Sequence, residues 1–255
     1  MMEEMSKMSA YKAHRLHVAW IQLLTGIYTL WSSIKIIFIS IFSKEPQRSI
    51  TAVTRLWGRK LIAPTGLVLK VKGAEHIEQS RGKPTVIMCN HTSLYDIPVS
   101  FLSLDVDLRM IAKKELFNIP VLSTALNKGD FVSIDRNNIE QAKKDLQVAE
   151  TKLKKGIVLW VAPEGTRSRD GKLRPFKKGG FHLAIDTNAQ IIPVAIKGLD
   201  KVLPSNSYDL IINGQVEIEI GEPIDSAGYD KKSCNELIQI TRNAMLELLG
   251  ENYND

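Results

Sequence analysis

The 255-residue chain predicts an α/β fold: a mostly parallel or mixed sheet flanked by helices, with a separate helical segment before it. From residue 67 onward, short apolar runs alternate with amphipathic stretches, and no internal repeat or low-complexity tract interrupts them. With 44% hydrophobic residues, a chain of this length can bury one large core. Pro64 and Gly66 predict a boundary, so we expect a helical segment over 1–66 and an α/β domain over 67–255.

The most apolar stretch lies near the N-terminus. No charged residue occurs from Leu16 to Ile34, and the apolar run resumes after Lys35 as far as Phe42. A helix of roughly 20 apolar residues can span a bilayer, so one span is possible. A stripe of weakly polar residues at nearly helical spacing instead favours a helix that lies in the membrane interface or packs against protein. The stripe comprises Gln22, Thr25, Gly26, Thr29, Ser32, Ser33, Ser40 and Ser43.

The apolar stretch is too long for a secretory signal peptide, and no small-residue cleavage site closes it. Residues 47–63 predict a second helix with Trp57 on its apolar side and basic residues elsewhere. Residues 1–66 hold nine Lys or Arg and three Glu, so they carry the whole net charge of +6. Basic amphipathic helices are typical of membrane surfaces, and we expect this segment to bind a bilayer. Alternatively, the second helix packs on the following domain. Nucleic-acid binding is disfavoured because the basic residues surround a long apolar run.

The rest of the chain predicts seven strands and five helices. Apolar runs of four to six residues, rich in β-branched side chains, predict strands at 67–71, 85–89, 108–112, 131–134, 157–161, 191–196 and 216–220. Between them, amphipathic stretches predict helices at 97–104, 120–126, 138–155, 181–188 and 231–249. The lysines of 138–155 indicate a solvated helix face rather than a binding patch.

One pair of residues follows the expected strand 85–89 directly. His91 and Asp96 lie five positions apart, where the carboxyl ends of strands commonly carry chemistry. A neutral imidazole can take a proton from an alcohol, and a carboxylate can orient it. This spacing arises by chance roughly a quarter of the time in a chain of this composition. The alternative is a hydrogen-bonded histidine in a turn, with Asp96 capping a helix.

A second group follows the expected strand 157–161. Residues 163–169 combine Gly165, which lets backbone approach a ligand, with the Thr166 hydroxyl and two guanidinium groups, Arg167 and Arg169. Such a set of groups can bind a phosphate monoester. More positive charge follows in 174–180. The alternative is an ordinary turn with solvated charges.

Together these motifs resemble the glycerolipid acyltransferases, in particular the 1-acyl-sn-glycerol-3-phosphate acyltransferases. Two further blocks of that family are present in order. The first runs from Lys113 to Leu116 and continues through Pro120 and Gly129 to 134–136, and the other is 192–194. The resemblance covers about residues 67–223. One departure is Ala162, which stands where the family usually has Phe; it concerns local packing rather than chemistry.

The resemblance implies a direct acyl transfer. Asp96 would orient His91, and His91 would take the proton from the sn-2 hydroxyl of lysophosphatidic acid. That oxygen would attack the thioester of acyl-CoA or acyl-carrier protein, giving phosphatidic acid. Backbone N–H groups near Gly165 would stabilise the oxyanion. No covalent acyl-enzyme and no cofactor are expected.

The resemblance also implies roles for the other polar residues. Arg167, supported by Arg136 and Lys113, would bind the phosphate, with Thr166 in the same substrate site. Glu164 would position the acceptor or hold Arg167, and Asn90 would order the loop.

The remaining expectations concern partners and location. Cys89 and Cys234 do not suggest a disulfide, and no residues show convincing metal-ligand or nucleotide-binding spacing. We expect a membrane-associated protein whose catalytic domain lies on the cytoplasmic side. Other acceptors, such as glycerol 3-phosphate or another lysolipid, remain open, as does the more distant possibility of a non-catalytic membrane-binding module.

Overall fold

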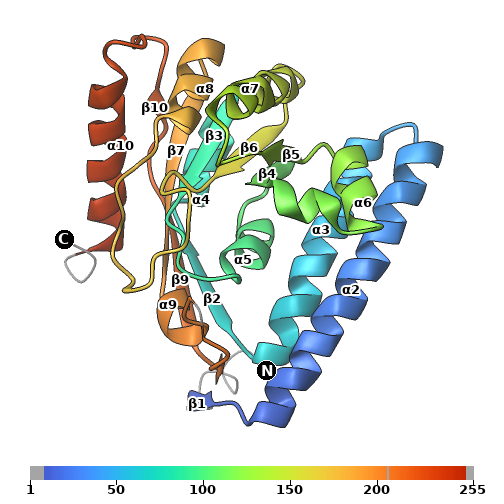
Figure 1. Cartoon of the computed structure of the whole chain (residues 1–255). Coiled ribbons are helices and arrows are strands. Elements are labelled where there is room, and N and C mark those ends of the chain that lie inside the picture. The colour runs from blue at the N-terminus through green and yellow to red at the C-terminus, as the bar shows by residue number, and fades with distance from the viewer. Residues whose placement is uncertain (1–8, 206, 251–255) are drawn as a thin grey trace.

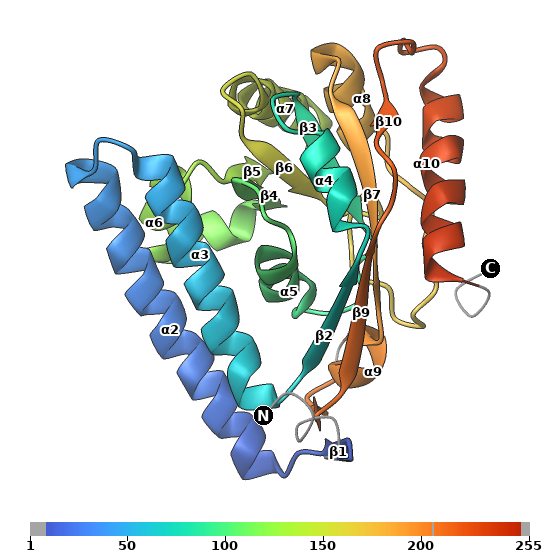
Figure 2. The same ribbon diagram turned by 180° about the vertical axis from the view of Figure 1, so that it is seen from behind.

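A computed structural model describes residues 9–205 and 207–250. A sheet of eight strands occupies the centre, helices cover both of its faces, and two long antiparallel helices stand beside it (Figures 1 and 2). The predicted α/β class with a mixed sheet is therefore confirmed.

The sheet is parallel except where β7 meets its later neighbours. Its order is β2-β9-β7-β3-β6-β4-β5, and β10 pairs with β7. Both β9 and β10 run antiparallel to β7, while every other neighbouring pair is parallel. The strands are β2 (Val68–Lys72), β3 (Thr85–Cys89), β4 (Leu108–Lys113), β5 (Val132–Ile134), β6 (Val158–Val161), β7 (Gln190–Lys197), β9 (Gln215–Ile220) and β10 (Ile224–Asp225).

Alternate residues of the central strand β3 enter two different cores. Ile87 and Cys89 join the core shared with α4, α5, α9 and the N-terminal helices. Val86 and Met88 join the core under α7, α8 and α10. This explains why β3 reads as a continuous apolar run, since a strand covered on both faces has no polar side.

The helices of the α/β domain include all five predicted ones and several short ones that the sequence did not reveal. They are α4 (Ala74–Gln79), α5 (Asp96–Ser103), η2 (Lys114–Asn118), α6 (Leu122–Lys128), α7 (Ile139–Leu153), α8 (Gly179–Thr187), α9 (Leu199–Val202) and α10 (Cys234–Leu249). The last helix begins later than predicted because the Asp230 carboxylate accepts the backbone N–H groups of Lys232 and Ser233 and holds them in a turn.

The N-terminal segment is a helical hairpin of α2 (Arg15–Phe42) and α3 (Pro46–Ile62), followed by the short η1 (Ala63–Thr65). The described part of the chain contains one helix long and apolar enough to cross a membrane, α2, and little of it is buried. Ile21 and Ile36 are buried, but most of its large apolar side chains point outward and are exposed. They include Trp20, Leu23, Ile27, Leu30, Trp31, Ile34, Phe38, Ile41 and Phe42.

The apolar side of α3 packs on the α/β domain, as the alternative interpretation held. Ile50 and Leu61 are buried, and the ring of Trp57 meets Phe101 of α5 edge to face, with centroids 6.0 Å apart. The indole N–H of Trp57 donates to the Thr29 hydroxyl of α2 at 3.0 Å. The exposed apolar surface of the hairpin therefore belongs mainly to α2. At its start, the hairpin is tied to the domain by a two-stranded sheet of β1 (Tyr11–Lys12) and β8 (Ile211–Ile212).

A buried arginine joins the hairpin to the sheet. Arg109 of β4 is fully buried, and its guanidinium donates to the carbonyl oxygens of Gln47 and Gly129 and to the Thr51 hydroxyl. Burial lowers the pKa of this arginine. It connects the first turns of α3 to the turn before β5.

Candidate active site

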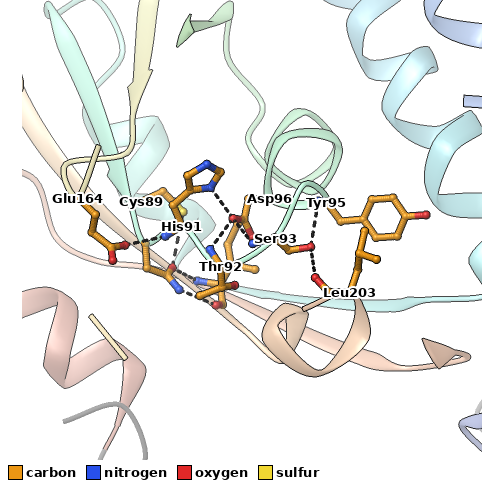
Figure 3. Close-up of polar contacts among 10 residues, drawn as sticks. Cys89, His91, Thr92, Ser93, Tyr95, Asp96, Glu164 and Leu203 are labelled. Atoms are coloured by element: carbon orange, nitrogen blue, oxygen red, sulfur yellow. Dashed lines mark hydrogen bonds and ion pairs between the residues drawn. The ribbon is translucent and has the colours of Figure 1, made fainter. Parts of the chain in front are cut away.

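His91 and Asp96 form a hydrogen-bonded pair at the carboxyl end of β3. The Nδ1 atom of His91 lies 2.7 Å from Oδ2 of Asp96 (Figure 3). The side chain of His91 is 15% exposed, whereas that of Asp96 is wholly buried in the first turn of α5. Because Asp96 engages Nδ1, Nε2 is the ring nitrogen left for a substrate.

The Asp96 carboxylate also holds the loop that leads into α5. Its Oδ2 atom accepts the backbone N–H groups of Thr92 and Ser93 at 2.8 and 2.9 Å. These bonds go to the loop before α5 and not to the N–H groups of the helix, so the geometry favours the orienting interpretation over capping. Three donors on one oxygen fix its position, and so fix the ring of His91.

Two further contacts fix the His91 loop. The Asn90 side chain pairs with the backbone of Ile196 in β7, accepting its N–H at 2.8 Å and donating to its carbonyl oxygen at 2.9 Å. The ring of Trp160 meets the imidazole edge to face, with centroids 5.9 Å apart. The sequence did not predict a role for Trp160, because a tryptophan in an apolar strand indicates only that the side chain is buried in the core.

Glu164 lies in the loop after β6, but its carboxylate does not hold Arg167. One oxygen accepts the backbone N–H of His91 at 2.8 Å, and the other accepts that of Arg174 at 2.9 Å (Figure 3 shows the first bond). The residue is buried, and burial raises its pKa to about 7, although both N–H bonds oppose the rise. Glu164 thus ties the loop after β3 to the loop after β6.

The expected oxyanion donors are backbone N–H groups near Gly165, and the structure distinguishes among them. The N–H of Gly165 donates to the Ala162 carbonyl at 3.0 Å, so it closes a turn and is not open to a ligand. Among the described residues, no acceptor takes the N–H of Thr166 or of Arg167. These next two amides are the better candidates. Gly165 itself has a φ of +73°, which favours glycine at this turn.

The expected cations follow neighbouring strands. Lys113 ends β4, Arg136 follows β5, and Arg167 follows β6, so all three lie at the carboxyl edge of the sheet. The Arg136 guanidinium donates to the Gly165 carbonyl oxygen, and burial lowers its pKa. The neighbouring Lys114 is engaged elsewhere, with Asp135 at 2.7 Å.

These groups line one cavity of about 770 Å³. Its polar members are His91, Lys113, Arg136, Thr166 and Arg167 at the strand ends. Elsewhere its wall is mostly apolar and comes from α2, α3, α5, β4, η2, α6 and the loop after α9.

The weakly polar stripe of α2 faces this cavity. Gln22, Thr25, Thr29, Ser32 and Ser33 all line it. Two of these hydroxyls donate to backbone four residues earlier, Thr25 to Ile21 and Ser33 to Thr29. The stripe therefore marks the inner face of the helix, where small polar side chains lie among Val18, Ile21 and Ile36, while most of the bulky side chains point outward.

Neither a disulfide nor a metal centre emerges from the part of the chain that the structure describes. Cys89 and Cys234 are both buried free thiols, and burial raises the pKa of each. No group of three or more His, Cys, Asp or Glu side chains within residues 9–205 and 207–250 could hold a metal ion.

Comparison with known proteins agrees with this geometry. The family model described as Acyltransferase matches residues 68–197. A chloroplast 1-acyl-sn-glycerol-3-phosphate acyltransferase of Arabidopsis thaliana is 31% identical over 199 residues, which are 78% of this chain and 55% of that protein. The chain thus spans about half the length of this plant relative.

Bacterial proteins match over nearly their whole length. The 1-acyl-sn-glycerol-3-phosphate acyltransferase of Escherichia coli (strain K12) is 29% identical over 230 residues, covering 90% of this chain and 91% of that protein. The crystal structure of the 1-acyl-sn-glycerophosphate acyltransferase PlsC from Thermotoga maritima superimposes with a TM-score of 0.76 at 26% identity. The match covers 90% of this chain and 92% of that one.

Proposed function

Because the chain belongs to the acyltransferase family, we propose that it transfers a fatty acyl group from a thioester donor to the sn-2 hydroxyl of lysophosphatidic acid, giving phosphatidic acid. The observation that carries the proposal is the His91–Asp96 pair beside three cations on the wall of one largely apolar cavity. Relatives named for this activity support the choice of acceptor.

The chemistry begins at Nε2 of His91. The imidazole takes the proton from the acceptor hydroxyl while Asp96 stabilises the imidazolium that forms. The acceptor oxygen then bonds to the thioester carbonyl carbon, and the oxyanion is stabilised by the amides of Thr166 and Arg167. When the tetrahedral intermediate collapses, the carbon–sulfur bond breaks and His91 returns the proton to the leaving thiolate.

The cations provide the acceptor site. Arg167 and Arg136, with Lys113, bind the phosphate monoester, because guanidinium groups pair with phosphate in a bidentate manner. The apolar wall takes up acyl chain, and each buried methylene contributes about 0.8 kcal/mol. The acyl group passes directly between substrates, so the reaction forms no acyl-enzyme.

The exposed apolar face of α2 supports membrane association. Because α3 attaches this hairpin to the α/β domain, α2 lies in the interface with its outer face in lipid and its inner face on the cavity. The lipid acceptor then enters from the bilayer and the donor from the cytoplasmic side.

The test is acyl transfer to lysophosphatidic acid in mixed micelles, with glycerol 3-phosphate as a parallel acceptor. We expect phosphatidic acid from the wild type and a loss of roughly three to four orders of magnitude in kcat for His91→Ala. If product formed only from glycerol 3-phosphate, the assigned acceptor would change to that molecule, but the general-base mechanism would stand. Equal activity of both proteins would refute general-base catalysis by His91.

A further inference from the structure

The segment 172–178 carries four cations and no acidic residue. It lies beside residues 162–169, the first part of the loop after β6, which we call the catalytic loop. The cations are Lys172, Arg174, Lys177 and Lys178, and all four are exposed. We call this segment the basic strap. The residues that line the cavity include none of these four. The proposed reaction therefore leaves their charge without a role.

The backbone of the basic strap is fixed to the catalytic loop. The N–H of Arg174 donates to Glu164 at 2.9 Å, and that of Lys177 donates to the Pro163 carbonyl oxygen at 2.8 Å. Since Glu164 also accepts the N–H of His91, the basic strap holds a defined position relative to the catalytic base.

The opposite side of the basic strap is anchored to the helices. The Arg242 guanidinium of α10 donates to the carbonyl oxygens of Leu173 and Arg174. The ring of Phe176 stacks on Phe181 of α8, with centroids 6.1 Å apart. Figure 1 shows the loop between β6 and α8 passing beside α10. The exposed cations therefore project from a held backbone rather than from a loose loop.

Among the four cations of the basic strap, Lys177 is the one whose side chain packs on Gly165. A Cβ atom placed on Gly165 would lie 2.9 Å from both Cδ and Cε of Lys177, so the lysine stem crosses the catalytic loop at the one residue that has no side chain. Its ammonium group thus lies beside the loop. Among the described residues no carboxylate pairs with it.

Resting on the proposed function, we propose that the basic strap, above all Lys177, binds the phosphate of a 4′-phosphopantetheine arm that carries the acyl donor. The cavity already supplies Lys113, Arg136 and Arg167 for the acceptor phosphate. The donor thioester must reach His91, while its carrier extends outside the cavity. Coenzyme A and acyl-carrier protein share this arm, so both present phosphate to the strap.

The experiment compares three donors with one acyl chain: acyl-CoA, acyl-carrier protein and the N-acetylcysteamine thioester, which lacks phosphate. Lys177→Ala and the double variant Lys177→Ala/Lys178→Ala are measured with lysophosphatidic acid as acceptor. We expect KM for a phosphate-bearing donor to rise about tenfold, with kcat little changed. The variant-to-wild-type ratio of kcat/KM for the truncated thioester should stay near one. Loss with only one of the two carriers identifies that carrier as the source of the phosphate.

Lys144→Ala is the matched control, since Lys144 is an exposed lysine of α7 that lines no part of the cavity. An equal loss of kcat/KM with all three donors would show that Lys177 merely supports the catalytic loop. An unchanged kcat/KM with every donor would show that Lys177 is not part of the donor site. Either result overturns the proposal. Failure of the proposed function is distinct, because the wild type would then make no phosphatidic acid from any donor.

Discussion

At the scale of single residues, the site depends on carboxylates that hold backbone as well as side chains. The Asp96 carboxylate is hydrogen-bonded to the imidazole of His91 and to two backbone N–H groups. The Glu164 carboxylate accepts one backbone N–H from each of two loop segments. Such residues keep the catalytic nitrogen still while a substrate is exchanged.

Replacement of Asp96 by Asn should separate these roles. An amide oxygen can still accept the N–H groups of Thr92 and Ser93, but it cannot stabilise an imidazolium as a carboxylate does. We expect kcat to fall by roughly three to four orders of magnitude while KM and the melting temperature change little. Steady-state kinetics with a thermal melt checks this. If the melting temperature fell by many degrees as well, holding the loop of Thr92 and Ser93 would be the main role of Asp96.

Glu164 makes stability depend on pH. Its pKa rises from 4.5 to about 7 on burial, so the native state binds this proton more tightly than the unfolded state does. The free energy of unfolding should therefore fall as pH rises from about 4.5 through 7, by on the order of 3 kcal/mol from this group.

Denaturant unfolding of the wild type and Glu164→Gln at several pH values measures this slope. The glutamine variant carries no ionisable group at this position, so its stability should vary less over the same window. Parallel pH curves for the two proteins would contradict the assignment.

At the scale of elements, the helical hairpin is divided between two environments. The apolar side of α3 faces protein, and most bulky side chains of α2 face outward, so we expect the two helices to have different functions. Two predictions separate attachment to the domain from attachment to lipid.

Arg109 should govern attachment to the domain. Its replacement by Met removes the guanidinium bonds to the carbonyl oxygens of Gln47 and Gly129 and to the Thr51 hydroxyl. We expect a loss of about 3–5 kcal/mol in the free energy of unfolding. Arg55→Met is the control, because Arg55 and Asp105 form an exposed pair whose removal should cost under about 1 kcal/mol. If both variants lost equally little free energy of unfolding, Arg109 would not be needed to attach the hairpin to the domain.

The outer face of α2 should govern attachment to lipid. We expect the double variant Trp31→Asp/Phe38→Asp to lose vesicle binding by at least about tenfold, since each side chain contributes about 1.5–3 kcal/mol when buried in an apolar phase. Flotation with anionic vesicles measures this. Ile139→Asp on α7 is the matched control, as Ile139 is 76% exposed and far along the chain from the hairpin. A comparable loss for the control would point to a general charge effect.

At the scale of the whole molecule, the sequence predicted the class of the sheet and all seven of its longer strands. Periodicity and apolar runs report burial, and burial on both faces makes strands such as β3 easy to recognise. The short elements α4, α9 and β8 were not predicted, because segments of two to six residues are too short to show a periodic pattern.

The site was predictable in its residues but not in its connections. His91 and Asp96 are near neighbours in sequence, so their pairing could be expected from spacing. The bond from Glu164 to the backbone of His91 spans 73 positions and has no local signature. Likewise, the approach of Lys177 to Gly165 depends on the path of a loop, which side-chain patterns do not describe.

The small sheet of β1 and β8 has a consequence for how the protein is made. Tyr11 pairs with Ile212, so about 200 residues must leave the ribosome before this contact can close. Contacts so distant in sequence form late, because the intervening chain must first lose its conformational freedom. The apolar hairpin therefore emerges long before its partner strand exists, and the cavity, whose wall includes both α2 and Leu210 beside that strand, can be completed only late in synthesis.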